Sequence, residues 1–374
     1  MNTLLQRLKT FCHQVTSVRT FCSASRYSVW HRPIATAFVA IIGCYANGTA
    51  LAGPIVINTV QELQNIQNNL SGDYILGSNI DASGFAFAPI GSNPFQGGTA
   101  FTGTFNGNGH TINGLTITAP SSDNVGLFGY VIGYTGGGTV ENVRLTNENV
   151  VGNGSGSVGG VIGYSDTGHI SNVSVSGSVK GITMGHVGGI VGSGGSYYGA
   201  SSLTSSFSTA TVQGEAGVGG LVGEGVFNIQ NTYAAGPVSG TSDVGGLAGI
   251  GGGSVSSSYA AGAVTGTSNV GGLIGSSGAY VQNSYWDTQA SGQSTSAGGK
   301  GLTTSQLQSG TLPTGFDPTV WTATAGQYPS LKSMAAPLDA TTAAMLSNLA
   351  YLPTKAITSV VHHSVWNLTD DWRG

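Results

Sequence analysis

Hydrophobic residues in this chain fall in short runs, separated by Gly, Ser, Thr and Asn, and one run recurs as a hexapeptide. The hexapeptide reads Val-Gly-Gly, two aliphatic residues and Gly, and successive copies start 33, 29, 31, 26 and 26 residues apart. Repeats in this range are typical of solenoids and propellers. The copies begin at Val158, Val187, Val218, Val244 and Val270, after a shorter variant at Val125.

A second pattern, an aliphatic residue followed two positions later by Asn or Ser, lies between the hexapeptides. Nine residues after its aliphatic member comes Val, and two later Gly, as at Ile229, Val238 and Gly240. Each repeat therefore offers three short extended segments and no run long enough for a helix. Three strands in 26 residues make one coil of a parallel β-helix, whereas a propeller blade needs about 40 residues. The predicted fold class is all-β, a parallel β-helix.

Stacked coils place like residues above one another. Aliphatic residues would fill the lumen, and the asparagines of the second pattern could form an amide ladder at a turn. Like charges one coil apart, at about 4.8 Å, would repel, which agrees with a charged content of only 7%. The ladder candidates are Asn142, Asn172, Asn231 and Asn283.

The two ends of the repeat region need caps. A capping box at Thr59 and an apolar stripe predict a short amino-terminal helix over 59–70. Strands are expected near 74–80, 86–90, 101–105 and 110–117, and Trp321, Tyr328 and Leu331 are expected to close the last coil. The predicted divisions are a cap with first coils (53–122), repeats (123–290), a carboxy-terminal cap (291–336) and an irregular or helical tail (337–374).

Residues 1–52 have the features of a secretory signal peptide. The first 32 residues hold five basic and no acidic side chains, a short apolar run follows, and Ala50-Leu51-Ala52 is a small-x-small cleavage pattern. Cleavage is expected between Ala52 and Gly53. Lipidation at Cys44 and an uncleaved amino-terminal helix are the alternatives. Cleavage would remove all three cysteines and leave a net charge of −9, from 6 basic and 15 acidic residues, which disfavours nucleic acid as a partner.

No catalytic, cofactor or metal site is predicted. The few basic residues of the repeat region lie on different coils, and no two carboxylates have the spacing that a glycosidase or lyase requires. Asp123, Asp243 and Asn269 are expected to stack in the loop before their hexapeptides, where Asp and Asn are turn formers. An aromatic column is the candidate binding platform, with structural ring stacking as the alternative. Its members are Phe207, Tyr233, Tyr259 and Tyr285.

Over about residues 55–335 the chain resembles the GLUG-motif repeat proteins of filamentous-haemagglutinin-like bacterial exoproteins. The matching segments are the hexapeptides, the lead-in from Phe101 to Leu115, Tyr285-Trp286-Asp287, and Gly301-Leu302-Thr303-Thr304. The resemblance implies a secreted parallel β-helix, often part of a larger adhesin, and it does not imply an activity. It also implies an outer-membrane secretion partner, although the secretion domain of two-partner exoproteins is not recognisable here.

These observations predict a non-enzymatic adhesin, secreted or held at the outer-membrane face of a bacterial cell surface. Its expected partner is a host-cell or matrix protein or a glycan, bound by many weak contacts along a rigid repetitive face. The alternatives are a polysaccharide lyase or glycosidase on the same fold and a structural stalk of the cell envelope.

Overall fold

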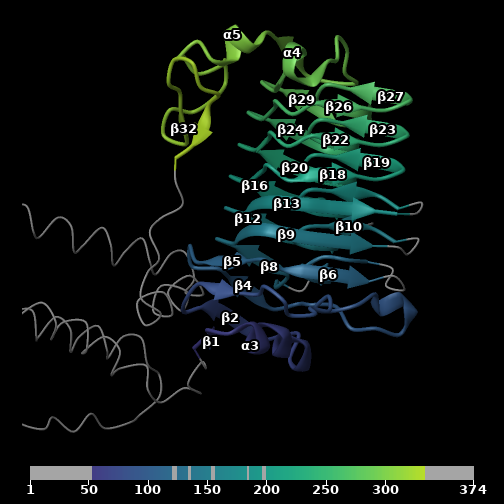
Figure 1. Cartoon of the computed structure of the whole chain (residues 1–374), viewed down its shortest axis with the longest axis vertical. Coiled ribbons are helices and arrows are strands. Elements are labelled where there is room, and N and C mark those ends of the chain that lie inside the picture. Colours follow the sequence, from purple (N-terminus) through teal and green to yellow (C-terminus); the bar gives the residue numbers. More distant parts are fainter. Residues whose placement is uncertain are drawn as a thin grey trace, which may run out of the picture. The chain divides into compact units, whose positions relative to one another are not determined.

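The computed structural model describes residues 53–119, 124–133, 136–152, 156–182, 185–195 and 199–332. Their strands stack as the coils of a parallel β-helix (Figure 1), so the predicted fold class is confirmed. The signal segment 1–52 and the tail 337–374 lie outside the described residues. Cleavage after Ala52, lipidation of Cys44 and the form of the tail therefore stay predictions.

Each regular coil crosses three parallel sheets in turn. Sheet 1 contains β1 (Ile55–Ile57), β2 (Asp73–Leu76), β4 (Thr104–Asn106), β7 (Phe128–Ile132), β8 (Thr139–Glu141), β11 (Ile162–Asp166), β12 (His169–Ser171), β15 (Val191–Gly194), β16 (Ser201–Thr204), β20 (Val222–Gln230), β24 (Ala248–Ser256), β28 (Ile274–Ser277) and β29 (Tyr280–Gln282). Sheet 2 contains β3 (Ile80–Asp81), β5 (Thr111–Asn113), β6 (Thr116–Ala119), β9 (Arg144–Gly152), β13 (Ser174–Gly181), β17 (Phe207–Ser208), β18 (Thr211–Gln213), β21 (Tyr233–Ala234), β22 (Val238–Ser239), β25 (Tyr259–Ala260), β26 (Val264–Thr265), β30 (Tyr285–Asp287) and β31 (Lys300–Leu302). Sheet 3 contains β10 (Val158–Gly159), β14 (Val187–Gly188), β19 (Ala216–Gly219), β23 (Ser242–Gly245) and β27 (Ser268–Gly271).

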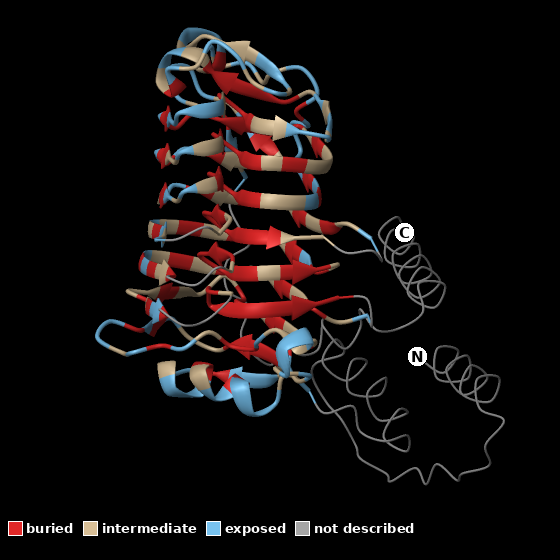
Figure 2. Cartoon of the chain, turned by 90° about the vertical axis from the view of Figure 1, so that its right-hand side faces the viewer, coloured by how far each residue is buried: buried red, intermediate tan, exposed pale blue. Residues whose placement is uncertain are grey.

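The hexapeptide forms the corner between sheets 3 and 1. Its Val side chains stack in register through β10, β14, β19 and β23, and its two aliphatic residues point into the lumen. Buried positions accordingly alternate with exposed ones along the coils (Figure 2). The second residue of the hexapeptide must be Gly for lack of space: a Cβ on Gly245 would meet the carbonyl oxygen of Ala248, and the other copies repeat this contact. Burial of these aliphatic columns supplies the main stabilising term of the fold.

The predicted amide ladder is confirmed on the earlier coils. Asn172 Nδ2 donates to Asn142 Oδ1 at 2.6 Å, and Asn142 Nδ2 donates to Asn106 Oδ1 at 3.1 Å. These positions also carry left-handed backbone, with φ of 56° at Asn172 and 57° at Asn142, a conformation that Asn tolerates well. Farther along, Asn231 Oδ1 instead accepts from Trp321 Nε1 at 3.2 Å.

The amino-terminal cap is shorter in α-helix than predicted. The Thr59 capping box starts α3 (Val60–Gln64), which continues as the 3-10 helix η1 (Asn65–Asn68) and buries Leu63 and Ile66. The expected strand 86–90 is reduced to isolated bridges at Ala86 and Ile90. The expected strands 74–80 and 110–117 are each divided into two, as β2 with β3 and β5 with β6.

At the carboxy-terminal end, the expectation that Trp321, Tyr328 and Leu331 close the last coil is wrong. The last coil is covered instead by the segment after α4 (Thr288–Ser291), where Ser296 Oγ accepts from Ile274 N–H at 2.9 Å. The chain then runs through α5 (Thr304–Leu307), and β32 (Trp321–Thr322) pairs antiparallel with β33 (Ser330–Leu331). This last part lies along the side of the stack (Figure 1). Residues 303–332 are called the side cap below.

Candidate functional site

The predicted aromatic column exists as a stack of rings on sheet 2. The rings of Phe207 and Tyr233 lie 4.7 Å apart with an interplanar angle of 2°, and those of Tyr233 and Tyr259 lie 5.2 Å apart at 8°. Tyr285 continues the column in register. One position per coil thus places aromatic side chains directly above one another.

The side cap covers most of this column, which corrects its interpretation as an open platform. Tyr259 OH donates to Pro329 O at 2.6 Å and Tyr285 OH to Thr314 O at 3.0 Å. Tyr259 is 1% exposed and Tyr285 8% exposed, while Phe207 and Tyr233 are half-buried. Burial raises the pKa of Tyr233 to about 12 and that of Tyr259 well above its ordinary value. The column therefore holds the side cap on the stack, which agrees with structural ring stacking, the alternative to a binding platform.

A second aromatic pair, on the outer face of sheet 1, was missed by sequence reasoning. Tyr130 on β7 and Tyr164 on β11 pair in register, and their rings stack 4.8 Å apart at 22°. Tyr164 OH donates to Gly195 O at 2.8 Å, which fixes the ring. Burial, followed by the charges of Asp166 and Glu224, raises the pKa of Tyr164. Each tyrosine directly follows the last Gly of its motif, so the two occupy equivalent positions. This equivalence is hard to see in the sequence because the first motif, at Val125, is one residue shorter than the second, at Val158.

A loop from an earlier coil lies beside this pair. Its ends are held in sheet 1, because Ile90 bridges to Phe128 and Phe101 bridges to Val131. Between them the 3-10 helix η2 (Pro94–Gln96) presents Phe95, which is 81% exposed. The loop and the tyrosines border an open hollow of about 330 Å³. Its lining side chains are Asn93, Phe95, Gln96, Asn124, Tyr130 and Tyr164.

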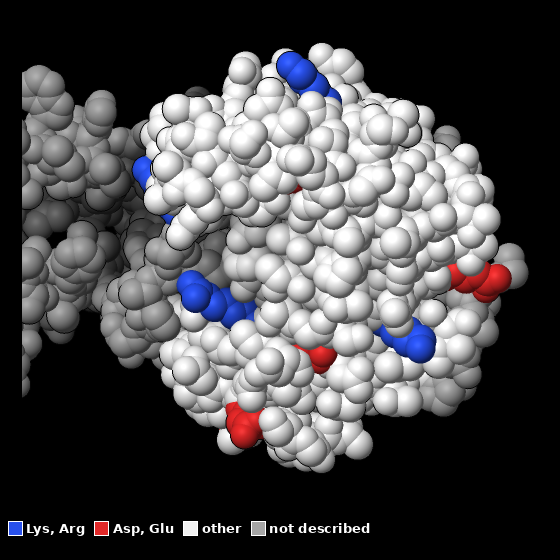
Figure 3. Space-filling model, turned by 45° about the horizontal axis from the view of Figure 1, so that its top comes forward, with Lys and Arg blue, Asp and Glu red and all other residues white. Residues whose placement is uncertain are grey.

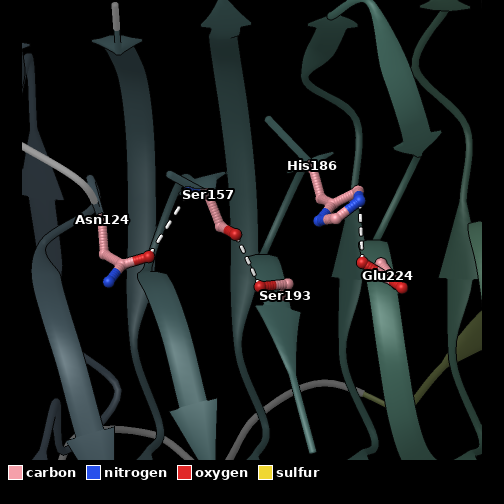
Figure 4. Close-up of polar contacts among 5 residues, drawn as sticks. All are labelled: Asn124, Ser157, His186, Ser193 and Glu224. Atoms are coloured by element: carbon pink, nitrogen blue, oxygen red, sulfur yellow. Dashed lines mark hydrogen bonds and ion pairs between the residues drawn. The ribbon is translucent and has the colours of Figure 1, made fainter. Parts of the chain in front are cut away.

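Hydroxyl, imidazole and carboxylate groups follow on the next coils, at the corner where sheet 3 meets sheet 1 (Figure 4). Ser157 Oγ lies 2.5 Å from Ser193 Oγ, and His186 Nε2 lies 2.7 Å from Glu224 Oε2. Asn124 Oδ1 accepts from Ser157 N–H at 3.3 Å. Ser157 and His186 thus each contact a sheet 1 side chain of the next coil, whereas Asn124 contacts the backbone of the next corner.

These groups do not form a nucleophile–base pair in the described part of the chain. A catalytic serine needs a base within hydrogen-bond reach, but Ser157 is paired with Ser193, and His186 with Glu224 (Figure 4). On later coils the same corner holds Asp243 and Asn269, with φ of 54° and 51°, and Asn269 Nδ2 donates to Asp243 Oδ1 at 2.8 Å. Their left-handed backbone agrees with the predicted role as turn formers, whereas Asp123 lies outside the described residues.

One buried carboxyl group is unrelated to the hollow. Glu148 on β9 points inward at a bulge opposite Gly177, is 2% exposed, and neither of its oxygens has a hydrogen-bond partner. Burial raises its pKa well above the ordinary value. Its carboxyl group touches the backbone at Gly160, where a Cβ would collide with it. Because Glu148 is buried and its oxygens have no hydrogen-bond partner, its carboxyl group costs the fold stability.

The repeated hexapeptide corners and the columns they build allow comparison with known families. Residues 154–180 match the family described as the GLUG motif. The resemblance to GLUG repeats is therefore confirmed at the level of the repeat, and the likeness to haemagglutinin-like adhesins stays a prediction.

Two curated relatives share this repeated part. Over 158 residues the chain is 36% identical to Halomucin of Haloquadratum walsbyi, covering 39% of this chain and 2% of that protein. Over 130 residues it is 36% identical to a glycine-rich protein of Evansella cellulosilytica, named as a candidate membrane protein, covering 33% of this chain and 14% of that protein. The chain thus spans a small part of the length of either relative.

A solved structure shares the fold. A protein of Bacteroides ovatus, designated a candidate immunoglobulin A1 protease, superposes with a TM-score of 0.58 over 75% of this chain and 92% of that one. The two are 21% identical, so the likeness concerns the β-helix alone. Within the described residues, no helix is long and apolar enough to cross a membrane.

Proposed function

We propose that this chain is a non-enzymatic adhesin, exported to the bacterial cell surface, that binds host or neighbouring surfaces through the outer face of sheet 1. The observation that carries the proposal is a column on that face without a Lys, Arg, Asp or Glu side chain. The column is held in register through β8, β12, β16, β20, β24 and β29. Its members are Thr139, His169, Ser202, Asn228, Ser254 and Tyr280.

A stacked column of this kind is suited to adhesion for two physical reasons. Its spacing is fixed by backbone hydrogen bonds between coils, so little conformational entropy is lost when a partner binds. It also repeats similar weak contacts along the stack, which adds avidity. The charged side chains in the view of Figure 3 are likewise few and scattered. The names of the two relatives support a cell-surface location, because one is named Halomucin and the other is named as a membrane protein.

Retention on surfaces tests the proposal. The purified full chain, fluorescently labelled, is applied to fixed cells, matrix proteins and immobilised glycans, and the signal that survives washing is recorded. The expected result is retention on at least one surface and a tenfold or greater loss when Ser202→Glu and Ser254→Glu are combined. The matched control combines Gln213→Glu with Thr265→Glu, which adds the same charge to sheet 2 and should leave retention unchanged.

Three results would overturn the proposal. Absence of retention on every surface would favour a stalk of the cell envelope, one of the alternatives above. Release of sugar from an immobilised polysaccharide would favour a carbohydrate-active enzyme. Equal loss with the sheet 1 and sheet 2 variants would mean that added charge, rather than the sheet 1 face, governs retention.

A further inference from the structure

We infer that the hollow beside Tyr130 and Tyr164 binds one neutral pyranose ring of a glycan. This inference rests on the proposed adhesive function and names the ligand class on the sheet 1 face. It comes from three observations: an aromatic arrangement that is already rigid, a border of amide side chains, and the absence of charged groups from the described lining of the hollow.

The aromatic part of the hollow is preorganised. The hydrogen bond to Gly195 and stacking on Tyr130 hold the Tyr164 ring, and Tyr130 packs with Ala100 and Ile132. A ring fixed before binding loses little side-chain entropy when a ligand contacts it.

Phe95 stands on the other border and is 81% exposed. Its position is fixed by the loop, because Asn93 Oδ1 accepts from Phe95 N–H at 3.0 Å and Gly97 ends η2 in left-handed backbone. Phe95 lines the same hollow as Tyr130 and Tyr164, so the three rings share one concave surface. The apolar C–H face of a pyranose would cover such a ring, as sugars present C–H groups on their faces and hydroxyl groups at their edges.

Amide side chains supply the polar contacts that the hydroxyl edges require. Asn93, Gln96 and Asn124 border the hollow, and an amide offers both donors and an acceptor. At Asn124 the Oδ1 atom faces Ser157, so the Nδ2 donors lie on the opposite side of the group (Figure 4). A volume of about 330 Å³ is at the lower end of ligand pockets, about 300–1,000 Å³, which suits a single ring.

The charges around the hollow favour a neutral sugar over an acidic one. Asp166 and Glu224 lie near enough to Tyr164 to perturb its phenol. Both are acidic, so a sialic acid or uronate would meet repulsion. Arg144, Lys180, Lys300 and Lys332 are the basic residues of the described part, and none borders the hollow.

The experiment titrates the full chain with neutral oligosaccharides of glucose, galactose, mannose and N-acetylhexosamine, and with sialic acid and oligogalacturonate, which have no neutral ring, as acidic probes. Saturation-transfer NMR and calorimetry report binding. We expect saturable binding of at least one neutral probe and none of the acidic ones. Phe95→Ala and Asn124→Asp should each weaken binding about tenfold, because the first removes the exposed ring and the second replaces the amide donors.

The matched control is Ile182→Ala, which removes another exposed apolar side chain, 51% exposed directly after β13 of sheet 2, and should leave the affinity unchanged. Failure of every neutral probe, preference for an acidic probe, or equal affinities for Phe95→Ala and Ile182→Ala would each overturn the inference. Cell retention of Phe95→Ala separates the two proposals: if it is unchanged, adhesion stands without this sugar site.

Discussion

The buried carboxyl group of Glu148 gives the sharpest test of the core. Glu148→Gln keeps the size of the side chain and removes its ability to ionise. Burial raises the pKa of Glu148 well above its ordinary value of 4.5, so the folded chain holds this proton more tightly than the unfolded chain does. The wild type should therefore lose stability relative to the variant as the pH rises above 4.5, up to the raised pKa.

The magnitude follows from proton linkage. One proton bound only by the folded state changes the free energy of unfolding by about 1.4 kcal/mol per pH unit. Because the unfolded carboxyl is still partly protonated at pH 5, the change in the difference between the two proteins from pH 5 to pH 6 has an upper limit of about 1.2 kcal/mol, reached when the folded carboxyl stays protonated throughout. All other titrating groups occur in both proteins and cancel in this difference.

Denaturant titrations of both proteins at pH 4, 5 and 6, followed by far-UV circular dichroism, measure that difference. Glu215→Gln is the matched control, because Glu215 is exposed and the same substitution there should change stability little at any of these pH values. A difference between Glu148→Gln and wild type that stays constant from pH 5 to pH 6 would refute the reasoning, since it would mean that the Glu148 carboxyl ionises as readily in the folded chain as in the unfolded one.

Three further substitutions test the cap, the corner and the ladder. Asp287→Ala should cost about 3 kcal/mol, because its carboxylate accepts from Ala290 N–H and from Tyr328 OH. Burial alone would raise the pKa of Asp287, but these hydrogen bonds outweigh burial and the pKa lies below its ordinary value. In denaturation at different pH values, the stability lost in the variant should therefore shrink as the pH falls through the folded pKa. Gly245→Ala should cost more than about 2 kcal/mol by thermal denaturation, whereas Gly278→Ala, whose Cβ would meet nothing, should be neutral. Asn172→Ala should lose about 1–2 kcal/mol because Ala is strained in left-handed backbone, in addition to losing the ladder hydrogen bond. Asn172→Gly loses the same hydrogen bond without this strain, so equal stability of the Ala and Gly variants would contradict the assignment.

The fold could be predicted from the sequence because every coil repeats the same physical problem. The Val of the hexapeptide must fill the lumen and the Gly after it must leave room for a carbonyl oxygen, so both residues recur. The side cap could not be placed in this way, because Trp321 contacts Asn231 across 90 residues of chain and such a contact leaves no periodic signal. The aromatic column at Tyr259 could be predicted because it repeats once per coil, whereas the side cap that covers it does not repeat.

The position of the hollow follows from where the repeats are irregular. On the later coils, spaced by 26 residues, each side chain lies above its counterpart and the surface is flat. The core register restricts insertions to loops, and an insertion changes the surface without disturbing the lumen. The loop between Ile90 and Phe101 is such an insertion, and both of its ends bridge to β7 beside Tyr130. The surface relief that borders the hollow therefore arises on the amino-terminal coils, where this loop is inserted, and the regular coils that follow have no such insertion.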